Sequence, residues 1–456
     1  MFKKSADLYN IIQLSDSYSP KGYIFYEYSR LNLFNNDINE FFSRLVHFFG
    51  IDKELLVKDW NEVNNCLPFR QPLYLYINIP FCRKKCPFCH YITYPAGIYK
   101  NLFDDYISSL KREMEILSAK AFFCRKPLFV AIGGGTPLIL SCRQLDKLCK
   151  NIYRHSPGEA MNISFETTVG ELLSAAGEDK IRILRQWGVN RLSIGVQTFD
   201  DNLLRKLGLG YSSQDAYRAI SFAREAGFEH INVDCMFGFS FNGEIESWKK
   251  TSRLLQILLP ESISLYQFRQ DSLKSGEFRL FSRRGYSSVL NERLVINQDL
   301  TNKGYIRCGR HYSRGKDVFA KEKPIHDWMV LEGDWLACGV NARSTFAGRG
   351  YCNTRKINYY ISCLRKNKMP VVRRVRYSLD EMQKQLIIKN IAYNRGINKR
   401  DFLCLFGYPL KAVFDKKIQF LTEKKIFLPL AGKSFIQKEY KPFDLEIINY
   451  LCRKYS

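Results

Sequence analysis

The 456-residue sequence lacks long hydrophobic runs, and no stretch approaches the ~18 uncharged apolar residues that a membrane-spanning helix needs. Its first residues, Met1 to Asp7, contain two lysines but no following apolar segment of the signal-peptide kind. Internal repeats and low-complexity tracts are also absent from the sequence. These absences argue against a membrane, secreted or repeat protein, and we expect a soluble cytoplasmic protein.

Acidic residues are few compared with basic ones. The chain has 70 Lys and Arg against 45 Asp and Glu, a formal charge of +25, and residues 361–456 alone carry 21 basic against 8 acidic residues. Such a bias is typical of nucleic-acid binding, but also of a solvated basic face. The expected helix Lys399–Phe406 bears only three charges beside Leu and Phe, which suits packing over a substrate equally well. We do not expect nucleic acid as a partner, although a nucleic-acid-binding C-terminal module is an alternative.

From residue 73 onward, strand-like and helix-like segments alternate. This alternation predicts an α/β fold with a parallel sheet and right-handed crossovers. Six units are too few for an eight-fold barrel, so we expect an incomplete (β/α)6 barrel that is open on one side. The expected strands are Leu73–Ile79, Pro127–Ile132, Asn162–Glu166, Arg191–Val196, Ile231–Met236 and Ser262–Gln267.

The alternation also predicts the domain organisation. After residue 270 the regular pattern ends, with a strand pair expected within Asp334–Phe346. Near the C-terminus, three helices at Ser378–Asn394, Lys399–Phe406 and Pro409–Glu423 precede a short β tail, which indicates a winged-helix-like module. The expected domains are an N-terminal extension (1–70), the core barrel (71–270), an α+β segment that extends the barrel (271–375) and the winged-helix-like module (376–456).

Three of the 14 cysteines, Cys82, Cys86 and Cys89, lie within eight residues directly after the first expected strand. This Cys-x3-Cys-x2-Cys spacing would arise in roughly 1% of shuffled sequences. Thiolates so close in a loop are typical metal ligands. Three of them leave one position of a [4Fe–4S] cluster unfilled, and an open iron can bind a chelating ligand. The alternative is zinc with His90, whose adjacency to Cys89 suits tetrahedral geometry poorly.

Glycines and polar side chains follow the other expected strands where each strand ends. Each of them alone has an ordinary explanation, such as a tight turn, a helix cap or a surface charge. Because ligands of parallel α/β sheets gather at the carboxyl ends of the strands, their joint position predicts a site for an amino-acid-like group and a nucleoside. The residues are Gly133, Gly134, Gly135, Glu166, Gln197 and Asp234.

Three ordered motifs resemble the radical S-adenosylmethionine (SAM) superfamily, and more narrowly its oxygen-independent coproporphyrinogen III oxidase-like branch. They are the cysteine motif after Ile79-Pro-Phe, the run Gly133-Gly-Gly-Thr-Pro137, and Gly188–Phe199. The resemblance covers about residues 72–430. It implies a [4Fe–4S] cluster, one or two molecules of SAM, a small-molecule substrate, and a one-electron donor such as flavodoxin or ferredoxin.

The resemblance also implies individual roles. Cys82, Cys86 and Cys89 would hold the cluster, and Tyr76 would lie near the reacting centre as the candidate catalytic residue. In this superfamily, cleavage of SAM yields a 5′-deoxyadenosyl radical that abstracts hydrogen from the substrate. The residues implied to contact or border SAM are Tyr76, Phe88, Gly133, Gly134, Gly135, Thr136, Glu166, Gln197 and Asp234.

Several positions depart from the pattern of the branch. Tyr91 stands where the oxidases carry a fourth cysteine, and Asn78 replaces a histidine. Leu209 stands where an arginine contacts SAM, and Arg205 or Lys206 on the same helix are candidates to replace it. These departures leave three functions open: oxidation of a tetrapyrrole or another unsaturated substrate, methyl or methylene transfer from a second SAM, and non-catalytic haem binding or delivery.

Overall fold

The structure is a computed structural model, and it divides into two compact units that we describe separately. One unit comprises residues 46–306 and 310–377, and the other comprises residues 1–45, 307–309 and 378–456. No helix among the described residues is long and apolar enough to cross a membrane. The described residues are 73–118, 127–155, 162–239, 246–268, 286–308, 311–314, 334–346, 349–377, 383, 397–398, 410–423, 427–430 and 433–436.

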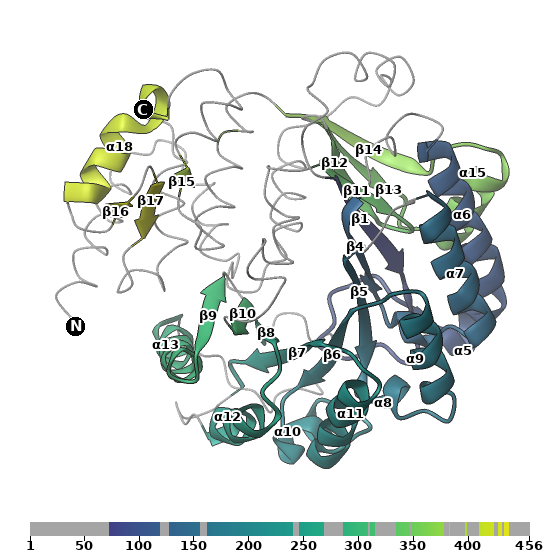
Figure 1. Ribbon diagram of the computed structural model, residues 1–456. Coiled ribbons are helices and arrows are strands. Elements are labelled where there is room, and N and C mark those ends of the chain that lie inside the picture. The colour runs from purple at the N-terminus through teal and green to yellow at the C-terminus, as the bar shows by residue number, and fades with distance from the viewer. Residues whose placement is uncertain are drawn as a thin grey trace. The chain divides into compact units, whose positions relative to one another are not determined.

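Six parallel strands form the centre of the large sheet (Figure 1). They pair in chain order, as the strand–helix alternation predicts, and the α/β fold with six β/α units is confirmed. The expected and observed bounds agree to within two residues at every strand. The six strands are β1 (Leu73–Ile79), β4 (Pro127–Gly134), β5 (Asn162–Thr168), β6 (Arg191–Gln197), β7 (His230–Phe237) and β8 (Ser262–Gln267).

Further strands extend this sheet at both sides. The complete order is β14-β13-β12-β11-β1-β4-β5-β6-β7-β8-β10-β9, so the sheet ends at β14 and β9 and does not close into a barrel. β11 pairs in parallel with β1, and the expected strand pair within Asp334–Phe346 is observed as β11 and β12. The added strands are β9 (Tyr305–Cys308), β10 (His311–Arg314), β11 (Asp334–Cys338), β12 (Arg343–Phe346), β13 (Arg349–Asn353) and β14 (Val371–Arg376).

Helices cover one face of the parallel strands (Figure 1). Two begin at side-chain caps: Ser141 and Gln144 exchange hydrogen bonds of 3.3 and 3.0 Å, and Ser212 and Asp215 form a capping box. The helices of this unit are α5 (Ala96–Tyr99), α6 (Phe103–Ser118), α7 (Cys142–His155), α8 (Val169–Leu172), α9 (Gly177–Gln186), α10 (Asp201–Lys206), α11 (Ser213–Glu225), α12 (Glu246–Leu258), α13 (Tyr286–Asn302) and α15 (Ile357–Arg365).

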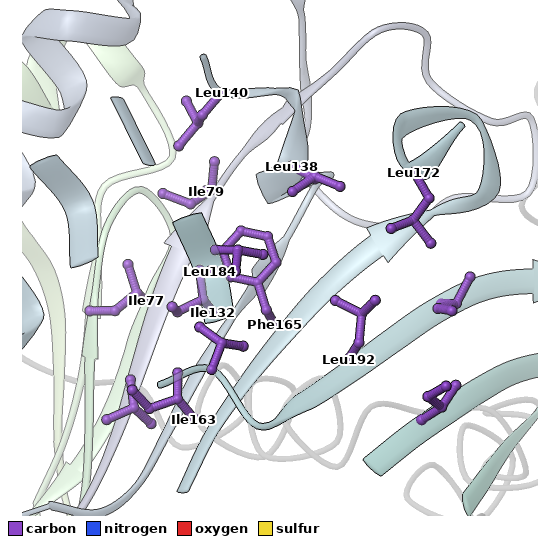
Figure 2. Close-up of a cluster of buried hydrophobic side chains, with 14 of the residues drawn as sticks. Ile77, Ile79, Ile132, Leu138, Leu140, Ile163, Phe165, Leu172, Leu184 and Leu192 are labelled. Atoms are coloured by element: carbon purple, nitrogen blue, oxygen red, sulfur yellow. The ribbon is translucent and has the colours of Figure 1, made fainter. Parts of the chain in front are cut away.

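The alternation of side chains along each strand separates an apolar core from an inner face. On β1, Leu75, Ile77 and Ile79 point toward the helices, where they join a buried cluster with Ile132, Phe165 and Leu192. Figure 2 shows Ile77 and Ile79 within this cluster. Successive strand residues point to opposite faces, so Tyr74, Tyr76 and Asn78 lie on the opposite side. We call this side, away from the helices, the inner face of the sheet.

The second unit contains one described helix, α18 (Lys411–Glu423), which confirms the helix expected at Pro409–Glu423. A three-stranded sheet in the order β15-β17-β16 accompanies it, with antiparallel pairing. Its strands are β15 (Ile397–Asn398), β16 (Phe427–Leu430) and β17 (Lys433–Ile436). The extension 1–70 and nearly all of the two other expected helices lie outside the described residues. The winged-helix-like arrangement and the four-domain division stay predictions.

Candidate functional site

The three clustered cysteines lie at the carboxyl end of β1, where the chain forms the short strands β2 (Phe81–Cys82) and β3 (Tyr94–Pro95). Cys82 is on β2, and Cys86 and Cys89 are in the connecting loop, with Cys89 N donating to Cys86 O over 3.0 Å. Burial, with a smaller contribution from the neighbouring Cys89, raises the pKa of the Cys82 and Cys86 thiols to about 11. The thiols therefore interact with one another, and a bound cation is needed to keep them as thiolates.

This donor set fits an iron–sulfur cluster. In the described part of the chain, no three cysteine, histidine, aspartate or glutamate side chains converge as a single bound ion would require. A [4Fe–4S] cluster does not need that convergence, because each thiolate binds a different iron. His90, the fourth ligand of the zinc alternative, is exposed beside Cys89.

The glycine run at the end of β4 lies directly against the carboxylate of Glu166 on β5. A Cβ added to Gly133 would be 2.3 Å from Glu166 Cδ, which is closer than real Cβ atoms approach. Gly134 has φ of +111°, where side chains are rarely tolerated, and its N–H donates to Glu166 Oε2 over 3.1 Å. The structure thus brings together two features that the sequence predicts to meet at this edge.

The same run also contacts the cysteine strand on its other side. A Cβ on Gly135 would lie 2.5 Å from Phe81 O and 3.0 Å from Cys82 Sγ. Thr136 Oγ1 lies 3.5 Å from Cys82 Sγ, and Thr136 N donates to Phe81 O over 2.8 Å. The three glycines therefore let the backbone pass between a thiol and a carboxylate, with no room for side chains at these contacts.

Gln197 and Asp234 lie on the neighbouring strands β6 and β7. Gln197 has a positive φ of 68° and lies at an irregularity in the β6–β7 pairing. Such a conformation is rare for a residue other than glycine and marks a candidate functional position. Asp234 is partly exposed on the inner face, and its two carboxylate oxygens accept from Asn232 Nδ2 at 2.8 Å and Ser193 Oγ at 3.2 Å.

Tyr211 connects the end of β6 with the cysteine loop. Its hydroxyl donates toward the carbonyls of Gly195 and Val196, at 3.2 and 3.0 Å. Burial raises the pKa of Tyr211, and the nearby Cys86 adds to this effect. The sequence motifs did not single out this tyrosine, because its partners are backbone atoms of another strand.

Tyr76, the candidate catalytic residue, lies on the inner face of β1. Its ring stacks on Trp335 of β11, with centroids 5.7 Å apart and an interplanar angle of 22°. Trp335 Nε1 donates to Arg343 O over 2.7 Å, which fixes the indole. Tyr74 and Phe129 are buried in the same aromatic group. Trp335 was not among the predicted site residues, since only the β1–β11 pairing brings it here.

Two of the departing residues have local explanations. Asn78 Nδ2 donates to Val340 O over 2.6 Å, and Asn78 O accepts from the Tyr106 hydroxyl at 2.7 Å. Asn78 thereby joins the end of β1 to the segment after β11. Tyr91 is 47% exposed, and its carbonyl accepts from Lys85 Nζ at 3.0 Å.

Leu209 belongs to an apolar group, the Leu209 cluster, which lies near the ends of β7 and β8. Its partly buried members are Phe88, Leu209 and Tyr266, and its buried members are Leu203, Leu207, Met236, Phe239 and Phe268. Arg205 and Lys206 are exposed on α10, and Arg205 donates to Asn202. Their placement does not support the idea that either replaces the arginine.

Comparison with known proteins identifies the class. The radical SAM superfamily matches residues 76–250. The chain is 27% identical over 354 residues to the heme chaperone HemW of Bacillus subtilis, covering 76% of this chain and 91% of HemW. It is 25% identical over 357 residues to the oxygen-independent coproporphyrinogen III oxidase of Synechocystis sp., covering 75% of each. The solved structure of coproporphyrinogen III oxidase (HemN) from Escherichia coli matches with a TM-score of 0.71 and 22% identity, covering 84% of this chain and 90% of HemN.

The chain therefore contains a radical SAM domain, and the predicted superfamily is confirmed. Within that superfamily it is similar to the coproporphyrinogen III oxidases and to HemW together. A radical SAM domain implies a [4Fe–4S] cluster and SAM as cofactors. The fold, with its TM-score of 0.71, matches that of the oxidase over most of both chains.

Proposed function

We propose that the chain is a catalytic radical SAM enzyme of the coproporphyrinogen III oxidase-like branch, with the cluster held by Cys82, Cys86 and Cys89. The observation that carries this proposal is the glycine run, which passes between Cys82 and the Glu166 carboxylate with no space for a Cβ. A purely structural turn does not need a thiol on one side and a carboxylate on the other. A ligand that chelates an iron and carries an ammonium group needs both, the thiolate to hold the iron and the carboxylate to bind the ammonium group.

Different residues around this run would bind different parts of SAM. Glu166 would accept from the ammonium group of SAM, and the backbone at Gly134 and Gly135 would lie along its methionine part. Gln197 and Asp234 would border the nucleoside. When bound, the cluster and SAM supply one-electron cleavage to methionine and a 5′-deoxyadenosyl radical, while the protein positions the ligands and keeps water away.

The inner face of β1 and β11 favours a flat, unsaturated substrate. Tyr76 and Trp335 are stacked there, beside Tyr74 and Phe129. Offset stacking on aromatic rings suits planar conjugated molecules, of which tetrapyrroles are one class. Tyr76 is the member of this group nearest in sequence to the cysteine loop, and it would contact both SAM and substrate.

Haem delivery without catalysis is the second candidate, because HemW, a relative at 27% identity, is a heme chaperone. Against it stands the glycine run between Cys82 and Glu166, which would suit SAM. Methyl or methylene transfer is a third outcome of the same site, since Tyr91 replaces the fourth cysteine of the oxidases and leaves the reaction open. The basic C-terminal residues lie largely outside the described residues, and nucleic-acid binding has no contact to support it.

The test is anaerobic reconstitution with iron and sulfide, followed by dithionite and SAM. We expect a brown protein that releases 5′-deoxyadenosine, and a Cys86→Ala variant that loses both colour and product. Cys363→Ala, at a partly exposed cysteine on α15, is the matched control and should behave as wild type. Stoichiometric haem binding without release of 5′-deoxyadenosine would favour haem delivery. S-adenosylhomocysteine as a co-product would indicate methyl transfer.

A further inference from the structure

A buried polar layer lies on the inner face of the sheet, beneath Asp234. It crosses five strands, and its hydrogen bonds are 2.8 to 3.4 Å long. All of its members except Asp234 are buried. The members of this polar layer are Ser164 on β5, Arg191 and Ser193 on β6, Asn232 and Asp234 on β7, Ser262 and Ser264 on β8, and His311 on β10.

Asn232 is the centre of the layer, and its amide can adopt only one orientation there. Its Oδ1 accepts from Ser262 Oγ at 2.9 Å and from Ser264 Oγ at 3.1 Å. Its Nδ2 must then face the other way, where it donates to Asp234 Oδ1 at 2.8 Å and to Ser193 Oγ at 2.9 Å. Since an amide nitrogen only donates, this orientation supplies a fixed donor to the carboxylate.

Ser193 supplies the second donor. Its Oγ accepts from Asn232, so its hydrogen is available for Asp234 Oδ2, which is 3.2 Å away. Each oxygen of the carboxylate thus receives a hydrogen bond from Asn232 or Ser193, and Ser264 also hydrogen-bonds to this carboxylate. A carboxylate oxygen can accept more than one, so acceptor capacity is left toward the space above.

The members of the polar layer differ in how deeply they are buried. Asn232 has no exposed surface, and Ser193 is 5% exposed, whereas Asp234 is partly exposed. Burial raises the pKa of Asp234, while the Arg191 charge and the hydrogen bonds from the layer act in the opposite sense. The layer therefore presents one partly exposed acceptor, the Asp234 carboxylate, to the inner face.

His311 adds a contribution from outside the radical SAM domain, which ends at residue 250. Its Nδ1 lies 2.8 Å from Ser264 Oγ, and β10 pairs with β8 at this position. Ser264 Oγ is also hydrogen-bonded to Asn232 Oδ1 and to the Asp234 carboxylate. The His311 tautomer protonated at Nδ1 donates to Ser264 and leaves the Ser264 hydrogen for these oxygens.

The ligand group that reaches Asp234 follows from strand spacing. Glu166 is on β5 and Asp234 is on β7, with β6 between them, so about 10 Å separate the two strands. A ligand whose amino-acid part lies at Glu166 would therefore bring its nucleoside part to Asp234. Of the hydrogen-bond donors in that part, the sugar hydroxyls are nearer to the amino-acid part along the molecule than the adenine amino group is.

We propose that Asn232 and Ser193 are positioning residues, which hold the Asp234 carboxylate as the acceptor for the sugar hydroxyls of SAM. Ser264 and His311 act one step further away, through the hydrogen bonds that link them to Asn232 and Asp234. This inference rests on the proposed function, because it takes SAM as the occupant. It adds a role for side chains that do not touch the ligand.

The first experiment measures SAM binding to the reconstituted full-length protein. We expect Ser193→Ala to weaken SAM binding about tenfold, the size typical of one hydrogen bond to a charged group. Asn232→Leu should weaken it further. Binding of the 2′,3′-dideoxy analogue of SAM should be the same in wild type and both variants, because it lacks the hydroxyls.

Ser252→Ala is the matched control. Ser252 is also a buried serine that donates to a carboxylate, Asp299 Oδ2 at 2.8 Å, but it lies on α12. It should leave the binding of both ligands unchanged. An equal loss for SAM and the dideoxy analogue in Ser193→Ala, or no loss for SAM, would overturn the proposal. Circular dichroism and iron content identify variants that have merely misfolded.

A second measurement does not depend on SAM. Infrared difference spectra against Asp234→Asn report the pH at which the Asp234 carboxyl protonates. Removing a hydrogen bond to the charged form should raise that pKa in Ser193→Ala, with Arg191 and His311 still present. His311→Asn, which keeps a donor near Nδ1, should resemble wild type, and His311→Ala should not. An unchanged pKa in Ser193→Ala would overturn the positioning role. If wild type binds no SAM, the proposed function fails and this measurement still decides the role.

Discussion

Replacing Gly135 by alanine tests whether the glycine run serves the cysteine strand. The added Cβ would lie 2.5 Å from Phe81 O, 2.9 Å from Phe81 N and 3.0 Å from Cys82 Sγ. Two of these atoms are backbone, so the contact is relieved only by moving β2 away from the end of β4. We therefore expect Gly135→Ala to displace Cys82.

The size of the effect follows from what that movement breaks. Gly135 N donates to Ile79 O, and Thr136 N donates to Phe81 O, both over 2.8 Å. Losing these two hydrogen bonds and overpacking the contact should together cost roughly 2–5 kcal/mol. Part of that cost should be seen as a lower iron–sulfur content rather than as a lower free energy of unfolding, because Cys82 lies on the strand that moves.

The assay is urea denaturation of the apoprotein, together with iron and sulfide content after reconstitution. Gly170→Ala on α8 is the control, since a Cβ added at Gly170 would have no neighbouring atom within 4 Å. It should keep wild-type iron and unchanged or slightly higher stability, because alanine favours a helix by up to about 1 kcal/mol. Wild-type stability and iron content in Gly135→Ala would refute the close packing of the glycine run against the cysteine strand.

Three further predictions concern residues around the site. Arg205→Ala and Lys206→Ala should each leave SAM affinity within about twofold of wild type, as expected for exposed side chains, and a tenfold loss would show that one of them does replace the arginine. Burial raises the pKa of Glu113 to about 7 from 4.5, so the neutral carboxyl stabilises the folded state fully below pH 4.5. This contribution to the free energy of unfolding falls by about 3 kcal/mol as the pH rises through 7. Urea denaturation at pH 5 and 8 should therefore show a smaller difference in stability for Glu113→Gln than for wild type. Trp335→Leu, which removes the stacking on Tyr76, should weaken substrate binding and leave SAM cleavage without substrate unchanged, as product analysis would show.

The parallel strands were predictable because their evidence is local. Continuous runs such as Leu73–Ile79 and Ser262–Gln267 are apolar on the helix side at every second residue, and their predicted bounds match the structure. The cysteines, the glycine run and Glu166 could be grouped for the same reason, since each follows a strand. The rule that carboxyl ends of parallel strands share one edge then brings them together without any knowledge of contacts.

Contacts between distant segments were not predictable. Trp335 reaches Tyr76 only because β11 pairs with β1, and no local pattern specifies which strand is the neighbour of another. Asn232 and Ser193 are a different case. Both alternate with Ile231, Val233 and Leu192, so the sequence does contain a signal, namely polar residues on the inner side of otherwise apolar strands. That signal lies in the middle of the strands, whereas the rule for ligand sites points only to the strand ends.

Leu209 removes a positive charge from the expected binding site for SAM. Where the branch has an arginine for SAM, this chain has an apolar side chain that packs with Phe88 and Met236. Phe88 directly precedes Cys89, so the Leu209 cluster extends apolar cover to the cysteine loop. In such surroundings the effective dielectric is low, and each remaining electrostatic contact is stronger than it would be in water.

The SAM carboxylate would then depend on the iron rather than on a guanidinium, because the N–H groups of Gly134, Gly135 and Thr136 already donate to Glu166, Ile79 and Phe81. The same apolar cover would exclude water from the radical, which protects a reactive intermediate from side reactions. We therefore expect Leu209→Arg to tighten SAM binding and at the same time increase the release of 5′-deoxyadenosine without substrate conversion. Tighter binding with no increase in unproductive cleavage would mean that the Leu209 cluster has no shielding role.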